Sequence, residues 1–377
     1  MGLFLEFHLI QNFAPSNLNR DDTGAPKDAI FGGQRRARVS SQCFKRAIRL
    51  AASEHELIPV AHRGVRTKKL RSLLLERLTN RDAEEAAGKI EVALGAAGLK
   101  LKDDGKTEYL LFLGENEING FAALIEQHWE ELAAGGDKKS KKDAKASLPL
   151  EVVKKAKSLL DGGKAVDVAL FGRMLADMPE ANRDAACQVA HAISTHRVER
   201  DFDYFTAVDD MGGPEESGAG MIGQVEFNSA TLYRYAVLDV RKLLSNLQSD
   251  RDLTLAALEA FAQAMVRAIP TGKQNSFAAH NAPEFVGVCL RHDAPLNLAN
   301  AFEKPVAPRP DKSLTGQSVE RLAEYEGKLS SYYAASTDQW ACLDLTGGWP
   351  AEKGGQLPSL AALAGWVREL VASELEA

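Results

Sequence analysis

The order of the predicted strands and helices constrains the fold of this chain more than any other feature. Near the start, Leu3, Leu5, Phe7 and Leu9 occupy every second position, and this period of two predicts a strand with one apolar face. The other expected elements are a helix that begins near Ser40 or Ser41, a strand at 166–172, a short helix at 186–193, a strand at 226–240, a helix from Asp250 to Ile269 and a strand at 284–290. Without the insertions and the short helix at 186–193, the order is strand–helix–strand–strand–helix–strand, the ferredoxin-like order that RNA-recognition modules also use.

The remaining segments interrupt this order. Residues 11–38 are predicted to form a long loop, and residues 55–164 are rich in Ala, Leu, Lys and Glu, with several interrupting glycines. We therefore expect a helical insertion at 55–164. A glycine-rich, acidic loop is expected from about Glu199 to Met221, and residues 360–374 have the pattern of an amphipathic helix.

Composition argues against several classes of protein. The 377 residues are 45% hydrophobic and carry a net charge of −6, as in an ordinary globular protein long enough for more than one domain. No apolar run approaches the roughly 18–20 residues that span a bilayer, and the apolar start carries Glu6, so we expect a strand there and not a signal peptide. The four cysteines form no CxxC pair, which argues against a zinc module or a disulfide scaffold. We expect a cytoplasmic protein that needs no cofactor or metal and does not bind a membrane.

Residues 17–49 form a basic island in this acidic chain. They hold eight lysines and arginines against three aspartates, a local balance of +5. The pair Gly32-Gly33 predicts a turn, and a serine cap at residue 40 or 41 would expose free N–H groups to a phosphate. On the following helix, Ser41, Lys45 and Arg49 share one face.

Two interpretations of the basic island are possible. Basic helices are usually solvated surfaces, and Arg35, Arg36 and Arg38 alone are compatible with ordinary surface positions. The combination of a glycine turn, paired serines and a basic stripe favours a surface that holds a nucleic-acid backbone without reading its bases.

Six sequence blocks, in order along the chain, closely resemble the CasC family. These are NRDD…KDAIFGGQRRARVSSQCFKRAIR in the basic island, VDVALFGRM (166–174), AHAISTHRVERDFDYFTAVDD (190–210), GQVEFNSATLYRY (223–235), GKQNSFAAHNAP (272–283) and LANAFEKPV (298–306). Members of that family are the repeated backbone subunits of Cascade, the type I-E CRISPR surveillance complex.

The resemblance implies an α+β fold with a modified RNA-recognition-motif palm, a helical fingers insertion and a protruding thumb. We expect the palm at 1–54, 165–198 and 226–377, the fingers at 55–164 and the thumb at 199–225. The implied partners are a CRISPR guide RNA, other copies of the chain in a filament, the large, small and end-capping Cascade subunits, and target DNA.

The same resemblance assigns residues to the guide RNA. Those in the basic island are expected to hold its backbone: Asn19, Arg20, Lys27, Arg35, Arg38, Ser40, Gln42, Lys45, Arg46 and Arg49. Four more are candidates only because they lie in family blocks: Met174, Lys273, Gln274 and Lys304. Because one subunit must accept any guide, contacts to the backbone fit this role, and base pairing reads the sequence.

The expected thumb is acidic and aromatic. From Glu199 to Glu226 there are eight acidic residues and one basic residue, so this segment is unsuited to gripping phosphates by charge. The resemblance implies that apolar side chains here displace guide bases, and the candidates are Phe202, Phe205, Thr206 and Met221. One alternative is that the aromatic residues anchor the loop in the core, and we expect about half of them to point inward. A further alternative is that the acidic residues contact the basic island of a neighbouring copy, which would stack copies head to tail.

A lysine-rich run at 137–157 carries a balance of +5. Such runs are most often solvated loops, but the resemblance places the fingers near target DNA. The candidates for non-specific DNA contact are Lys138, Lys139, Lys141, Lys142 and Lys145.

Asp21, Asp22 and Asp28 raise the question of catalysis. The related backbone subunits of type III complexes cleave RNA with an aspartate in a comparable loop. Here the aspartates lie among arginines, which favours structural ion pairs, and the resemblance implies a non-catalytic role. The alternative is a metal-dependent RNase of the type III kind.

Overall fold

The computed structural model describes residues 2–132, 148–175, 178–207, 210–211, 221–333 and 337–376. The chain divides into two compact units. Unit 1 comprises Met1–Leu57, Gln188–Val240 and Leu258–Ala377, and unit 2 comprises Ile58–Cys187 and Arg241–Ala257. Across these described ranges, no helix combines the length and the apolar character that crossing a membrane requires.

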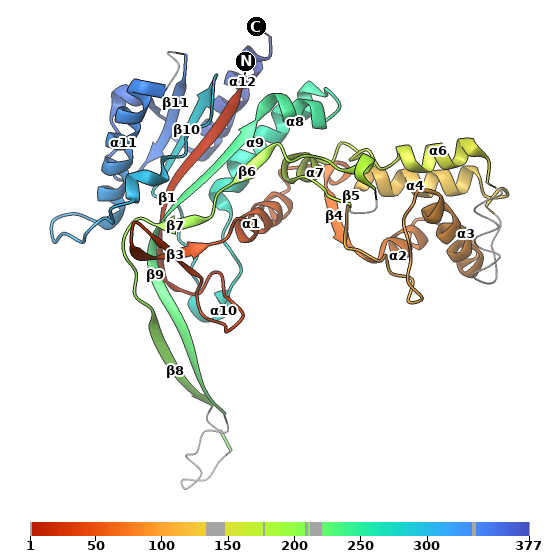
Figure 1. The fold of residues 1–377 in the computed structure, drawn as a ribbon, viewed down its shortest axis with the longest axis horizontal. Coiled ribbons are helices and arrows are strands. Elements are labelled where there is room, and N and C mark those ends of the chain that lie inside the picture. The colour runs from red at the N-terminus through yellow and green to blue at the C-terminus, as the bar shows by residue number, and fades with distance from the viewer. Residues whose placement is uncertain are drawn as a thin grey trace. The chain divides into compact units, whose positions relative to one another are not determined.

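Unit 1 is organised around one large sheet (Figure 1). Within the described residues the strand order is β12-β11-β10-β1-β9-β7-β3-β2, and β6 and β8 also pair with β9. The strands are β1 (Phe4–Ser16), β2 (Asp28–Phe31), β3 (Gln34–Val39), β6 (Cys187–Val189), β7 (Ala192–Ser194), β8 (Asp201–Ala207), β9 (Met221–Asp239), β10 (Phe285–Arg291), β11 (Gln339–Asp344) and β12 (Gly355–Gln356).

Strand β1 lies in the middle of the sheet and is antiparallel to both β9 and β10. Both of its faces are buried over most of its length. On the first face, Phe7 packs edge-on against Phe261 of α9, with ring centroids 5.3 Å apart. On the second face, Ile10 joins a cluster with Phe285 and with Val319 of α11. The helices of this unit are α1 (Ser41–Glu54), the part of α9 (Arg251–Arg267) from Leu258 onward, α10 (Gln274–Phe277), η3 (Leu298–Phe302), α11 (Leu314–Tyr333), η4 (Ala351–Lys353) and α12 (Leu360–Glu374).

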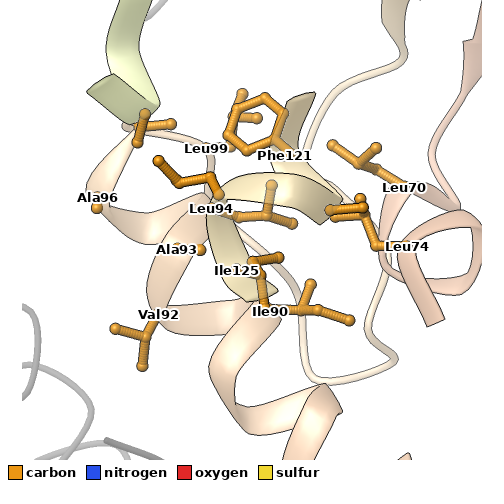
Figure 2. Close-up of a cluster of buried hydrophobic side chains, with 14 of the residues drawn as sticks. Leu70, Leu74, Ile90, Val92, Ala93, Leu94, Ala96, Leu99, Phe121 and Ile125 are labelled. Carbon is orange, nitrogen blue, oxygen red and sulfur yellow. The ribbon is translucent and has the colours of Figure 1, made fainter. Parts of the chain in front are cut away.

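Unit 2 is mainly helical and has its own core. Its elements are η1 (Val60–His62), β4 (Gly64–Thr67), α2 (Leu70–Leu75), α3 (Ala83–Ala96), β5 (Leu111–Gly114), α4 (Glu115–Gln127), α6 (Leu150–Ser158), α7 (Val166–Phe171), η2 (Pro179–Ala181) and α8 (Val240–Asn246). Figure 2 shows Leu74 of α2, Ile90 and Leu94 of α3, and Phe121 and Ile125 of α4 gathered in this core. Burial of these apolar side chains contributes to the stability of unit 2.

Most of the predicted elements are confirmed. The strand at the start is β1, and the helix after Ser40 is α1. The strands at 226–240 and 284–290 are found as β9 and β10, and the C-terminal helix as α12. Asp250 caps α9 as expected, because its Oδ1 accepts a hydrogen bond from the Leu253 N–H at 3.1 Å.

Four predictions were wrong. Residues 166–172 contain helix α7 in place of the expected strand, because a short apolar run is compatible with either a strand or a helix. Gly172 ends this helix with a φ of +77°. Residues 186–193 contain strands β6 and β7 in place of a helix, since pairing with β9 overrides local propensity. The expected loop at 11–38 contains the end of β1 and the β2–β3 hairpin. The expected loop at 199–221 contains strand β8.

Candidate nucleic-acid interface

The N-terminus of α1 is built by two polar side chains of the basic island. Ser40 is the cap, because its hydroxyl accepts a hydrogen bond from the Cys43 N–H at 3.3 Å. Asn19 fixes this cap in turn, since its Oδ1 accepts from the Ser40 N–H at 2.9 Å. Ser40 is buried, whereas Gln42 in the first turn is exposed. Asn19 and Ser40 therefore shape the helix end, and Gln42 lies on its accessible side.

The exposed side of α1 carries the expected basic stripe. Phe44, Ala47 and Ile48 are buried, and the Arg234 guanidinium of β9 lies over the Phe44 ring. Lys45 and Arg49 are partly exposed. This arrangement places the two cations on the solvent-facing side of the helix, in line with its N-terminus.

A groove of about 550 Å³ lies between α1, the loop after Leu18, and the turn at 270–272. Its charged lining residues are Arg20, Arg46, Asp21 and Asp22. The Arg46 guanidinium donates a hydrogen bond to the Thr271 hydroxyl at 3.4 Å. A Cβ on Gly272 would lie 2.3 Å from the Leu18 carbonyl oxygen, so only glycine permits this close approach. This close approach fixes the turn at 270–272 against the loop after Leu18, and α1 completes the groove.

Asp21 stabilises the turn of the loop that lines this groove. Its Oδ1 accepts hydrogen bonds from the Thr23 N–H and hydroxyl and from the Ala25 N–H, at 2.7–3.0 Å. The hydrogen bond from the Thr23 side chain is the main reason that the pKa of Asp21 lies below its usual range. The Lys27 N–H donates to the Asn19 carbonyl at 2.8 Å, which closes the loop and places Lys27 beside the cap of α1.

The β2–β3 hairpin turns at Gly32 and Gly33, as predicted, with φ values of +56° and +73°. A Cβ on Gly32 would lie 1.9 Å from the Glu303 carbonyl oxygen, so the turn lies directly against the segment that continues into Lys304. Lys304 is exposed. The hairpin thus brings Lys304 next to the basic island.

Asp28 of β2 is held by two arginines. The Arg35 guanidinium pairs with its carboxylate, and Arg200, at the base of the β8–β9 hairpin, pairs with it at 2.9 Å. Arg200 also pairs with Glu226 at 2.9 Å. Burial lowers the pKa of Arg200, but the hydrogen bond to Glu226 and the charge of Asp28 outweigh burial and raise it. These pairs fix the base of the β8–β9 hairpin to β2.

Arg36 and Arg38 have different roles, although they are close in sequence. Arg36 is fully buried and donates to the carbonyl oxygens of Ser194 at 2.9 Å, Phe302 at 2.8 Å and Glu303 at 3.1 Å. The interpretation of Arg36 as a surface residue is therefore wrong, because it ties β3 to β7 and η3.

Arg38 is partly exposed. Its Nε donates to the Asp28 carbonyl at 3.0 Å, and its guanidinium lies 3.1 Å from His191 Nδ1. His191 is an exposed residue of this surface that sequence reasoning did not assign to RNA, because only the pairing of β3 with β7 brings 191 beside 38.

The remaining candidates differ in accessibility. Lys273 and Gln274 follow the turn at the groove, and the Gln274 side-chain amide donates to the Pro270 carbonyl at 2.9 Å, which shapes this turn. Met174 belongs to unit 2, where its side chain is 84% exposed. The five lysine candidates for DNA contact, Lys138, Lys139, Lys141, Lys142 and Lys145, lie outside the described residues.

The expected thumb contains a two-stranded ribbon in which β8 pairs with the first part of β9 (Figure 1). Phe202 is 59% exposed, and Tyr204, Phe205 and Thr206 are also exposed. The expectation that about half of these aromatic residues point into the core is therefore wrong. The Phe205 ring covers its cross-strand partner Gly223, where a Cβ would lie 2.2 Å from it. Met221 pairs with Ala207 through the backbone.

Comparisons with known proteins identify the family of this chain and chains with a similar fold. The family model described as "CT1975-like protein" matches residues 5–366. Among solved structures, one chain of a "CRISPR RNA-guided surveillance complex, pre-nicking" is 29% identical, with a TM-score of 0.82, and the match covers 97% of this chain and 99% of that chain. A chain of a "CRISPR RNA-guided surveillance complex" is 26% identical, with a TM-score of 0.75 and the same two coverages. No curated protein matches. The chain belongs to the CT1975-like protein family of CRISPR-associated proteins.

Proposed function

We propose that this chain is a non-catalytic backbone subunit of a type I-E CRISPR RNA-guided surveillance complex. The observation that carries the proposal is the joining of distant segments into one basic surface. The α1 stripe, the groove with Arg20 and Arg46, and Arg38 beside Lys27 all belong to unit 1. Two chains of solved surveillance complexes match nearly the full length of this chain, which supports a role in such a complex.

The architecture suits this role. In chain order, β1, α1, β7, β9, α9 and β10 follow the βαββαβ pattern of RNA-recognition modules. Four of these strands are neighbours in the order β10-β1-β9-β7. We assign the palm to the sheet of unit 1, the thumb to 199–225 and the fingers to the helical insertion of unit 2.

The mechanism follows from the kinds of contact that these residues make. Lys45, Arg46 and Arg49 contact phosphates, and phosphate contacts carry no sequence information, so one subunit accepts any guide. Several copies line up along one guide RNA, and the exposed Phe202 and Phe205 displace bases at intervals. The other bases stay ordered for pairing with target DNA, which lowers the entropic cost of pairing. The partners are the guide, other copies, and the large, small and end-capping subunits.

The environment of the aspartates favours binding over catalysis. Asp21 accepts hydrogen bonds within its own turn, and Asp28 is engaged by Arg35 and Arg200. Asp22 is exposed beside the groove, so it is the residue on which the alternative, a metal-dependent RNase, depends. A scaffold protects bound RNA with any divalent metal, whereas an RNase shortens it and loses this activity in Asp22→Ala.

The test of the proposal uses two matched double variants. Lys45→Ala with Arg49→Ala should abolish assembly on guide RNA and leave the chain folded. The control is Lys242→Ala with Arg368→Ala, which removes the same two residue types where they pair with Asp184 and Glu259. RNA that co-purifies with the chain is measured, and circular dichroism verifies folding. Normal assembly of the first variant would contradict the assignment of α1 as the phosphate-binding helix.

A further inference from the structure

A second basic groove lies on unit 1, beside helix α11. Its volume is about 480 Å³, and it runs between the segment after η3 and the exposed side of the helix. Lys304 and Arg309 line it from the segment, and Arg321 lines it from α11. Arg321 also donates a hydrogen bond to the Pro305 carbonyl at 3.4 Å, which ties the two walls together.

The charges in this groove do not cancel. Two acidic residues line it, but each is paired with a lysine outside the lining: Glu320 with Lys312 at 2.8 Å, and Glu324 with Lys328 at 2.5 Å. Within the described ranges, Lys304, Arg309 and Arg321 form no ion pair with a carboxylate. The hydrogen bond and charge of Lys328 lower the pKa of Glu324, and the charge of Arg321 adds to this effect. The lining as a whole therefore holds three cations against two carboxylates, and these carboxylates also pair with lysines outside it.

The groove continues the basic island. Glu303, which precedes Lys304, lies against the Gly32 turn, and its carbonyl accepts a hydrogen bond from buried Arg36. These contacts fix the start of the groove beside the β2–β3 hairpin. Burial lowers the pKa of Arg36, and the charge of Arg321 lowers it further. Arg321 in the groove is therefore close enough to act on Arg36 in the basic island.

We propose that this groove binds the phosphodiester backbone of a nucleic acid through Arg309 and Arg321, as an extension of the surface that holds the guide RNA. The inference rests on the proposed function of the chain. Guanidinium groups offer several N–H donors in a planar fork that matches phosphate oxygens. The continuity with the basic island favours a nucleic-acid strand over an acidic protein segment.

The test measures binding of a single-stranded RNA short enough to hold one copy, over a range of salt concentrations. Each phosphate contact on a single strand contributes about 0.7 to the salt slope, so Arg309→Gln with Arg321→Gln should make the slope shallower by about 1.4. Between about 50 and 200 mM salt, the wild type should then lose roughly sevenfold more affinity than the variant. The variant Glu320→Gln with Glu324→Gln should bind more tightly, and Lys242→Gln with Arg368→Gln, neither of which lines the groove, should bind like the wild type.

A second arm adds complementary DNA to the guide. If the salt slope of the arginine double variant is shallower with RNA alone, the guide is the ligand. If the slope becomes shallower only when DNA is added, the ligand is the target strand. Unchanged slopes in both arms would overturn the proposal. The double arginine variant could instead bind the one-copy RNA like the wild type but form shorter assemblies on long RNA. That result would also overturn the proposal, because the groove would then bind an acidic surface of a second copy. If the wild type binds no RNA, the proposed function itself fails, whereas normal wild-type binding with an unaffected variant refutes only this groove.

Discussion

Replacement of Arg36 by methionine separates structural from RNA-binding arginines in the basic island. The buried guanidinium donates to three carbonyl oxygens, those of Ser194, Phe302 and Glu303. Methionine fills much of the volume but donates nothing. A buried acceptor left without a partner costs about 1–3 kcal/mol. Because the contact with Glu303 is only partly buried, water can compensate for part of the loss there, and we expect unit 1 to lose about 3–5 kcal/mol of its free energy of unfolding.

Urea unfolding followed by tryptophan fluorescence measures this loss. Of the four tryptophans, only Trp129 belongs to unit 2, so a Trp129→Phe background reports on unit 1 alone. With an m-value of about 3 kcal/mol per molar urea, the midpoint should fall by about 1–2 M. The matched variant Arg35→Met removes an arginine whose side chain is 50% exposed, and it should change the free energy of unfolding by less than about 1 kcal/mol. An unchanged midpoint for Arg36→Met, together with weaker RNA binding, would refute the structural role.

Three further predictions concern the helix cap, the thumb and a buried carboxylate. Ser40→Ala should lower the free energy of unfolding by about 1 kcal/mol and weaken RNA binding, and thermal unfolding and RNA titration measure these two effects. Ser41→Ala is the control, and equal effects of the two substitutions would contradict the assignment of Ser40 as the cap. Phe202→Ala should leave the melting temperature unchanged but alter the reactivity of guide bases to chemical probes, since its side chain is exposed; an unaltered probing pattern would contradict base displacement. Burial of Glu6 raises its pKa, but the hydrogen bond and charge of His8 and the charge of Arg291 outweigh burial and lower it. The stability that Glu6 contributes is therefore present above the unfolded pKa, about 4.5, and is lost as the pH falls through the lower folded pKa. Glu6→Gln should remove this part of the acid dependence in urea unfolding, and identical pH profiles would contradict the sign.

The parts of the fold with a strong local signal were predictable. The alternation of Leu3, Leu5, Phe7 and Leu9 predicted strand β1 and one of its buried faces, although the opposite face, with Glu6 and His8, is buried as well. Ser40 and Asp250 cap the two helices whose starts were predicted there. Caps depend on hydrogen bonds within a few residues, which is why sequence suffices for them.

Elements that depend on tertiary pairing were not predictable. The run at 166–172 is apolar in either state, and only its surroundings make it α7. Strands β6 and β7 are three residues each and exist because β9 pairs with them. The sequence makes no prediction for α11, so the groove with Arg309 and Arg321 had no sequence signal.

The same limit applies to the candidate site. Arg35, Arg36 and Arg38 look alike in the sequence, yet one pairs with Asp28, one is buried and one faces His191. Which of the three is buried depends on where η3 packs. The spacing of residues within the basic island does not predict that contact. Charge composition identified the surface, and only the structure distinguishes the roles of its members.

In the proposed function, several copies of this chain hold one guide RNA. The most direct measurement is to co-express the chain with a CRISPR guide RNA and the companion subunits, purify the assembly, and determine the mass of the complex and of the extracted RNA. We expect one defined, nuclease-protected RNA with multiple copies of the chain. No retained RNA, or an RNA whose shortening depends on Mg²⁺ and on Asp22, would contradict it.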